Sequence, residues 1–164
     1  VRCVLETVST RVGNGPFRSE LFVSTGDYIA KKGVEIGTVT KRQRRCGWLD
    51  LVSLKYSCEI NSVNELCMTK ADVLNNLSEI RVCKSYNSKK YEDVNFSESD
   101  ILDSLSLDES DFEIFSSWGE IKDLSKFEIL PDNLKKYISY IEEYLTIPIK
   151  IISLGPERNQ TIIR

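Results

Sequence analysis

The 164-residue sequence contains no histidine. It therefore cannot supply a Ser–His–Asp triad, a Cys–His pair or a His-ligated metal. No apolar run approaches the roughly 20 residues that a membrane-spanning helix needs. The net charge is −3, so no overall positive field favours nucleic acid. We expect neither a nucleic-acid partner nor a membrane segment.

A CxxC motif is also missing, and the number of cysteines is odd. Most of the five lie among apolar neighbours, and no histidine is present to activate a thiolate. We interpret them as reduced, mostly buried thiols, which are typical of a cytoplasmic protein. They are Cys3, Cys46, Cys58, Cys67 and Cys83.

Length and composition predict one globular α/β domain. Hydrophobic residues make up 41% and charged residues 29%, and a chain of this length can bury a core without disulfides. Strands and helices alternate, which predicts a mixed sheet with flanking helices. Strand-like segments stand at both ends, so we expect the chain to be part of a longer protein. The expected strands are 1–5, 65–69, 79–86, 149–153 and 161–164, and the expected helices are 28–32, 51–58 and 132–145.

The clearest helix follows Pro131. Its apolar residues recur at i, i+3, i+4, i+7 and i+11, which predicts one buried face. They are Leu134, Tyr137, Ile138, Ile141 and Leu145. By contrast, residues 92–113 contain nine acidic residues and neither Lys nor Arg, which predicts a solvated, loop-rich insertion.

Residues 69–72 read Thr-Lys-Ala-Asp and follow the expected strand 65–69. Ligands of open α/β sheets bind at the carboxyl ends of strands. At such a place the carboxylate of Asp72 can accept hydrogen bonds from guanine N1–H and the exocyclic amino group together. Adenine does not offer that pair, and the stem of Lys70 can lie across the base. This pattern predicts a guanine site.

Residues 153–156, Ser-Leu-Gly-Pro, follow another expected strand. A small residue and a glycine let the backbone approach a flat ligand, and backbone N–H groups there could donate to a guanine carbonyl. An ordinary exit from a strand into a turn remains the alternative.

The segment 37–45 carries four cations in five residues, Lys41, Arg42, Arg44 and Arg45. Arginine pairs bidentately with carboxylates and phosphates, so the segment predicts an anion site. A solvated basic loop is the alternative. A nucleic-acid patch is disfavoured because no other basic stripe supports it.

Several segments in this order resemble the C-terminal half of the adenylosuccinate synthetase (IMP–aspartate ligase) family. The resemblance extends over the whole chain, and independent motifs at family spacing make it specific. The segments that carry it are 9–17 (STRVGNGPF), 44–50 (RRCGWLD), 69–74 (TKADVL), 155–156 (GP) and 161–162 (TI).

The resemblance implies the C-terminal portion of a P-loop NTPase-like fold and a part in AMP biosynthesis. In that family GTP phosphorylates the 6-oxygen of IMP, and the amine of L-aspartate displaces phosphate to give adenylosuccinate. Mg²⁺ is required, and full-length members are typically cytoplasmic homodimers. The phosphate loop, the catalytic Asp and His and the metal site belong to the N-terminal half. We therefore expect no catalytic or metal-binding residue in this chain and no activity from it alone.

The resemblance also implies roles for single residues. Arg42 would contact aspartate and the IMP ribose, and Arg44 would pair with the aspartate carboxylate near the GTP phosphates. The family usually has Thr-Thr-Gly-Arg where this chain has Val39-Thr40-Lys41-Arg42. A hydroxyl is therefore lost, and Lys41 is expected either to restrict the motion of the loop or to adopt a positive φ that favours glycine. The aspartate loop is Thr38, Val39, Thr40, Lys41, Arg42, Gln43 and Arg44; the guanine pocket is Lys70, Ala71, Asp72, Ser153, Leu154 and Gly155.

Two further hypotheses belong to other classes. One is a stand-alone guanine-nucleotide or anion-binding module without turnover, and the other is a structural or interaction domain that keeps the family scaffold. A glycine-rich phosphate loop and a histidine upstream in the reading frame would favour the enzyme.

Overall fold

The computed structural model describes residues 2–22, 24–39, 41–97, 107–121 and 126–164. The chain divides into two units, each of which carries most or all of one four-stranded sheet. The architecture is mixed α/β, as predicted, although two sheets are present instead of one. Unit 1 comprises Val1–Thr7, Ser53–Ile80 and Ile114–Arg164, and unit 2 comprises Val8–Val52 and Arg81–Glu113.

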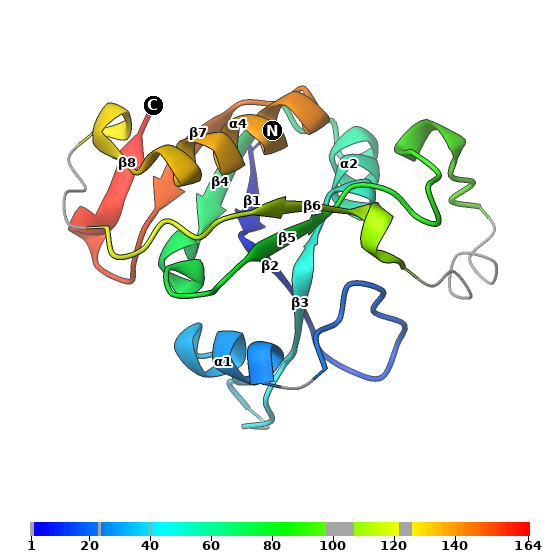
Figure 1. The fold of residues 1–164 in the computed structure, drawn as a ribbon, viewed down its shortest axis with the longest axis horizontal. Helices are drawn as coiled ribbons and strands as arrows, with labels where there is room; N and C mark the ends of the chain where they lie inside the picture. The colour runs from blue at the N-terminus through cyan, green and yellow to red at the C-terminus, as the bar shows by residue number, and fades with distance from the viewer. Residues whose placement is uncertain (1, 23, 40, 98–106, 122–125) are drawn as a thin grey trace. The chain divides into compact units, whose positions relative to one another are not determined.

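Unit 1 contains a sheet of order β1-β4-β7-β8 (Figure 1). Strands β1, β4 and β7 are parallel, and β8 is antiparallel to β7. All four match expected strands to within one or two residues. Their bounds are Arg2–Glu6 (β1), Glu65–Thr69 (β4), Ile149–Ser153 (β7) and Thr161–Ile163 (β8).

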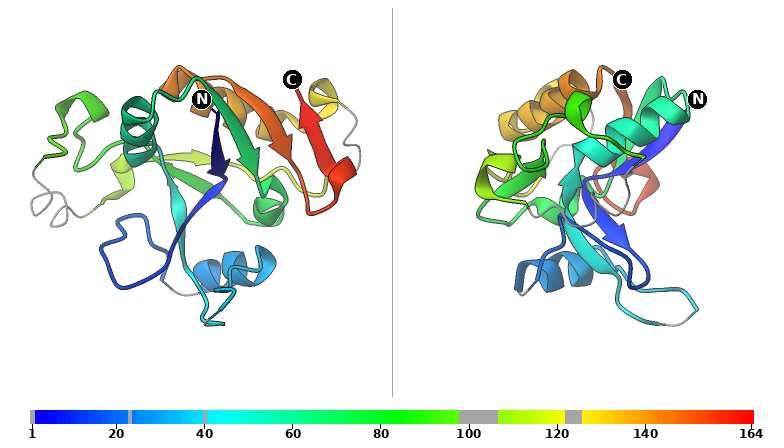
Figure 2. Two further views of the ribbon diagram at one scale, coloured as in Figure 1. Left: turned by 180° about the vertical axis from the view of Figure 1, so that it is seen from behind. Right: turned by 90° about the vertical axis from the view of Figure 1, so that its right-hand side faces the viewer.

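One row of paired residues across this sheet is buried. Register pairs Leu5 with Met68, Met68 with Ile152 and Ile152 with Ile162, and none of the four is more than 5% exposed. Helix α4 (Asp132–Leu145) lies against one face of this sheet, and it overlaps the strands both in Figure 1 and in the view from behind in Figure 2. All five residues of its predicted apolar face are buried. Hydrophobic periodicity therefore located this part of the core correctly.

The opposite face of the same sheet is only partly covered. It carries the neighbouring row Val4, Cys67, Ile151 and Ile163, paired across the four strands. Val4 is 65% exposed and Ile163 is 79% exposed, at the two edges. Successive residues of a strand point to opposite faces of the sheet. The buried row and the more exposed row therefore lie one residue apart along each strand.

Unit 2 holds most of the second sheet, of order β2-β3-β5-β6. Strands β2 and β3 are antiparallel, whereas β3 and β5 are parallel. Helix α1 begins four residues before its expected start, and α2 follows Asp50 as predicted. The bounds are Val8–Arg11 (β2), Ser24–Lys32 (α1), Arg45–Asp50 (β3), Leu51–Ile60 (α2), Ile80–Cys83 (β5) and Phe112–Phe115 (β6).

The acidic segment departs from the expected solvated loop. Its described residues include a short 3₁₀ turn, Glu109–Asp111, and the start of β6, and Asp111 has no exposed surface. Aromatic and aliphatic residues in and beside the segment cover a cluster of Val52, Cys83 and Tyr86. Residues 98–106 lie outside the described part of the chain. The acidic composition of the segment therefore led us to overlook its apolar residues, which pack against the core of unit 2.

All five cysteines are free, and Cys46, Cys58 and Cys83 are buried, as expected. Burial raises the pKa of Cys58 to about 11 and also raises the pKa of Cys83. These thiols are therefore protonated near neutral pH, in keeping with a packing role. None of the described helices is both long and apolar enough to cross a membrane.

Candidate functional site

The two segments predicted to bind guanine leave the sheet of unit 1 at the same edge. Thr69 ends β4 and Ser153 ends β7. The two strands are parallel neighbours, with Met68 opposite Ile152. Residues 69–72 and 153–155 therefore emerge side by side from the carboxyl ends of adjacent strands, where α/β sheets bind ligands.

The backbone of the first segment is fixed by buried partners. Lys70 has a left-handed conformation, with φ 62° and ψ 30°. The Thr7 hydroxyl donates to the Lys70 carbonyl over 2.9 Å, and the Trp118 indole N–H donates to the Ala71 carbonyl over 3.0 Å. Thr7 and Trp118 are both buried. A lysine in this conformation costs roughly 1–2 kcal/mol, which these contacts offset.

Asp72 lies in the turn of 3₁₀ helix Ala71–Leu74 and is half-buried. Within the described residues its carboxylate has no hydrogen bond or ion pair. The neighbouring Lys70 Nζ lies 3.6 Å from Glu6 Oε1, and both side chains are about one-third exposed. The turn therefore presents an acceptor with two oxygens on a rigid backbone, which can accept two parallel N–H donors.

The second segment is shaped by Gln160. The Leu154 N–H donates to the Gln160 carbonyl over 2.8 Å, and the Leu154 side chain is buried. A Cβ on Gly155 would lie 2.3 Å from Gln160 Oε1. In this structure, therefore, the space beside Gly155 is occupied by the side chain of Gln160. The N–H of Leu154 is already used, and among the described residues the N–H of Gly155 has no acceptor.

The basic segment of unit 2 forms a hairpin-like loop. Ile36 bridges Gln43, Gly37 N donates to the Arg42 carbonyl, and Lys41 N donates to the Gly37 carbonyl. Lys41 has φ 54°, the left-handed conformation expected where the family usually has glycine. Thr40 lies outside the described residues.

The side chains of this loop divide into exposed and anchored ones. Val39 is 90% exposed, and Arg42 is exposed with no ion pair in the described part of the chain. Gln43 donates to Asp27 over 3.1 Å. The four cations therefore do not form a single cluster, since the exposed Lys41 and Arg42 stand apart from two anchored arginines.

Arg44 and Arg45 are anchored in different ways. Arg44 Nη1 donates to Glu35 Oε2 over 3.1 Å, while Arg44 Nε is shielded from water and has no partner. Arg45 pairs through two nitrogens with the Glu20 carboxylate and also donates to the carbonyls of Gly13 and Gly15.

The hydrogen bond from Arg45 lowers the pKa of the Glu20 carboxyl, against the opposing effect of burial. All three nitrogens of the Arg45 guanidinium donate to protein acceptors. Arg44 donates to a protein acceptor only through Nη1.

Sequence analysis missed the residues that support the site. Thr7 and Trp118 lie 63 and 47 residues from the carbonyls they contact, and no local pattern links them. Glu35 gave a weak signal, because it is a carboxylate between Val34 and Ile36 in a segment bounded by glycines. A charged residue flanked by apolar ones needs a buried partner.

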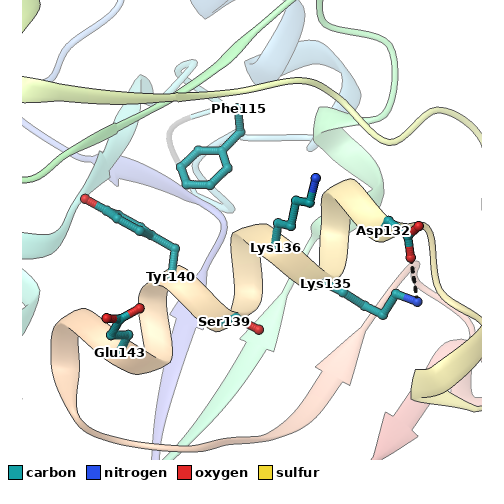
Figure 3. A pocket seen from close by; sticks show the side chains of 7 residues that line it. All are labelled: Phe115, Asp132, Lys135, Lys136, Ser139, Tyr140 and Glu143. Atoms are coloured by element: carbon teal, nitrogen blue, oxygen red, sulfur yellow. Dashed lines mark ion pairs between the residues drawn. The ribbon is translucent and has the colours of Figure 1, made fainter.

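A groove of about 460 Å³ lies on α4 in unit 1 (Figure 3). Phe115 and Tyr140 face one another across it, with ring centroids 5.3 Å apart. Lys135 pairs with Asp132 at its other end. No residue assigned to guanine or anion binding lines it.

Comparison with known proteins gives one consistent family. The adenylosuccinate synthetase family model matches residues 1–162. The chain is 43% identical to adenylosuccinate synthetase from Chromohalobacter salexigens and 42% identical to that from Helicobacter pylori. These alignments cover 98% and 97% of this chain but only 37% and 38% of the relatives.

A solved structure agrees with the sequence comparison. The chain superposes on the fully ligated adenylosuccinate synthetase of Plasmodium falciparum with a TM-score of 0.87 and 41% identity. The match covers 98% of this chain and 39% of that one. The resemblance and the fold class predicted from sequence are thereby confirmed, and the chain spans somewhat over a third of the length of these relatives.

Proposed function

Because the chain belongs to the adenylosuccinate synthetase family, we propose that the protein of which it forms part ligates L-aspartate to IMP. GTP supplies the phosphoryl group, and the products are adenylosuccinate, GDP and phosphate, in AMP biosynthesis. The observation that carries this proposal is the family match across residues 1–162. The expected homodimer and cytoplasmic location stay predictions.

The role we propose for unit 1 is to select guanine. Asp72 accepts from N1–H and the exocyclic amino group, and the stem of Lys70 lies against the base. The proposal is supported by the absence of a protein partner for the Asp72 carboxylate in the described residues, and by the buried hydrogen bond to Ala71 that fixes its turn. Ser153, Leu154 and Gly155 complete the pocket through their backbone, with the N–H of Gly155 as its available donor.

The role we propose for unit 2 is to bind aspartate. Arg42 contacts aspartate and the IMP ribose, and Arg44 pairs with the aspartate carboxylate near the GTP phosphates. Both are supported by geometry, because Arg42 is exposed, and the Arg44 side chain is one-third exposed with only Nη1 paired to Glu35. Thr38, Val39 and Lys41 shape the tip of the loop between them.

The phosphoryl transfer itself is assigned to the remainder of the protein. The family resemblance assigns the phosphate loop, the Mg²⁺ site and the catalytic Asp and His to the N-terminal half, and this chain has no histidine. We therefore place these groups outside this chain. Mg²⁺ would neutralise charge on the transferring phosphate.

Asp72 gives the direct test of this proposal. In the full-length protein, Asp72→Asn turns a donor toward the donors of guanine and should cost roughly 2–3 kcal/mol in GTP use. Xanthosine triphosphate has a carbonyl in place of the guanine amino group and should recover part of the rate. An unchanged KM for GTP would refute the guanine assignment.

Turnover separates the enzyme from the alternative of a non-catalytic guanine-nucleotide or anion-binding module. We expect the full-length protein to convert IMP in the presence of GTP and aspartate, and the 164-residue chain alone to be inactive. Guanine-nucleotide binding by the full-length protein without turnover would favour the module.

A further inference from the structure

We propose that Glu35 is a positioning residue that holds Arg44 in the orientation needed to bind the substrate carboxylate. This inference rests on the proposed function of the loop. It adds a residue that acts on the substrate through the arginine.

Glu35 is placed by its neighbours on both sides. Its N–H donates to the Ala30 carbonyl at the end of α1, and its carbonyl accepts from Arg44 N, each over 2.8 Å. A Cβ on Gly33 would come within 3.4 Å of the Glu35 side chain. Val34, just before it, has φ 51°, a strained conformation for a β-branched residue. The carboxylate is thus fixed in a packed site where it is only 1% exposed.

The ion pair uses only one side of the guanidinium. Glu35 Oε2 accepts from Arg44 Nη1 over 3.1 Å. In the described residues Arg44 Nε and Nη2 have no acceptor, and Nε is already shielded from water. Nη2 is therefore the donor left for a substrate carboxylate. The Glu35 contact orients the guanidinium before the ligand arrives, which reduces the entropy lost on binding.

A second ion pair next in sequence provides a matched control. Glu20 and Arg45 also join a largely buried carboxylate to a guanidinium that is about one-third exposed. Arg45, however, spends its remaining Nη1 donor on the carbonyls of Gly13 and Gly15. Loss of Glu20 should therefore reduce stability without removing an aspartate ligand.

Charge and positioning predict opposite results when Glu35 is replaced. Removing a carboxylate beside an anion site should tighten aspartate binding if net charge decides the affinity. If Glu35 acts by positioning, its removal should weaken binding, because the arginine side chain becomes free to adopt other rotamers. The sign of the change in aspartate KM distinguishes the two.

The experiment measures steady-state kinetics of the full-length protein with aspartate varied at saturating GTP and IMP. We expect Glu35→Ala to raise the aspartate KM about tenfold, with the IMP KM changed less than threefold. Glu35→Gln keeps an acceptor oxygen for Nη1 and should recover much of the loss. Glu20→Gln should lower the melting temperature but leave the aspartate KM within about twofold.

A double-mutant cycle with Arg44→Leu completes the test. If Glu35 acts through Arg44, Glu35→Ala should have no further effect on the aspartate KM in the Arg44→Leu background. Independent, additive effects would overturn the inference, as would an aspartate KM that is unchanged or lower in both Glu35 variants. If Arg44→Leu alone leaves the aspartate KM unaltered, the proposed function of the loop fails instead.

Discussion

Asp111 provides a test of the fold that does not depend on function. Its carboxylate accepts four hydrogen bonds within unit 2, from the Ser85 hydroxyl at 2.6 Å and from the N–H groups of Asn87, Ser88 and Asp108 at 3.0, 2.8 and 3.1 Å. Asn87 and Ser88 both have positive φ, in the turn bridged by Tyr86 and Lys89. The carboxylate therefore holds a strained turn in place.

We expect Asp111→Ala to lower the free energy of unfolding by about 4 kcal/mol. Each hydrogen bond to a charged acceptor contributes about 1.5–3 kcal/mol, and removing the buried charge returns part of the total. Asp111→Asn keeps one oxygen but turns an NH₂ group toward donors, so about 2–3 kcal/mol should be lost.

The pH dependence should follow the same contacts. Burial alone would raise the pKa of Asp111, but the hydrogen bonds from Ser85, Ser88, Asp108 and Asn87 outweigh it and lower the pKa below its usual value. A lowered carboxyl pKa stabilises the fold above the unfolded pKa of about 3.9, and this stability is lost as pH falls through the folded value. The wild-type protein should therefore lose more stability than Asp111→Asn on acidification through this range.

The assay is urea denaturation of the full-length protein, combined with hydrogen exchange of the peptide that covers residues 84–89. Exchange at Asn87 and Ser88 should accelerate in both Asp111 variants. Asp93→Asn is the control, because Asp93 is an exposed carboxylate in the same acidic segment and should change stability by less than about 0.5 kcal/mol. Unaltered exchange and an unaltered urea midpoint in Asp111→Asn would refute the reasoning.

Two further predictions concern the loop of unit 2 in the full-length protein, each read from steady-state kinetics. Arg42→Leu and Arg44→Leu should both raise the aspartate KM by one to two orders of magnitude, about 1.4–2.8 kcal/mol, and Arg42→Leu should raise the IMP KM more. Equal IMP values for the two variants would contradict the placement of Arg42. Lys41→Gly should leave the aspartate KM no higher than in the wild-type protein, because glycine adopts φ 54° without the cost of about 1–2 kcal/mol, whereas Lys41→Val should raise it. Indistinguishable glycine and valine variants would show that the loop conformation does not limit binding.

Local patterns predicted helix α4 and the strands of unit 1 well, whereas β2, β3 and β6 match no strand expected from the sequence. The spacing of Leu134, Tyr137, Ile138, Ile141 and Leu145 located α4, and every one of these side chains is buried. The short run 65–69 became β4 within its predicted bounds. These elements are predictable because a helix or strand exposes its apolar residues with a fixed period that can be read along the chain.

For the candidate site, the sequence pointed only to the residues that are proposed to face the ligands. Asp72 was selected as a carboxylate that follows a strand, and Arg44 as one of four cations within five residues. The sequence also carried the family motifs, and the comparisons confirm that family. Composition misled at the acidic segment, where charge masked Asp111 and the apolar residues beside it.

The partners of these residues were decided by the tertiary structure alone. Thr7 and Trp118 fix the turn before Asp72, Glu35 anchors Arg44, and Asp111 closes a turn more than 20 residues away. Each contact joins a side chain to a backbone or side-chain group elsewhere in the chain, and many polar residues could make it equally well by type. Folding selects one partner because a buried donor or acceptor without a hydrogen bond costs free energy, and these groups become buried together only after the sheets have formed.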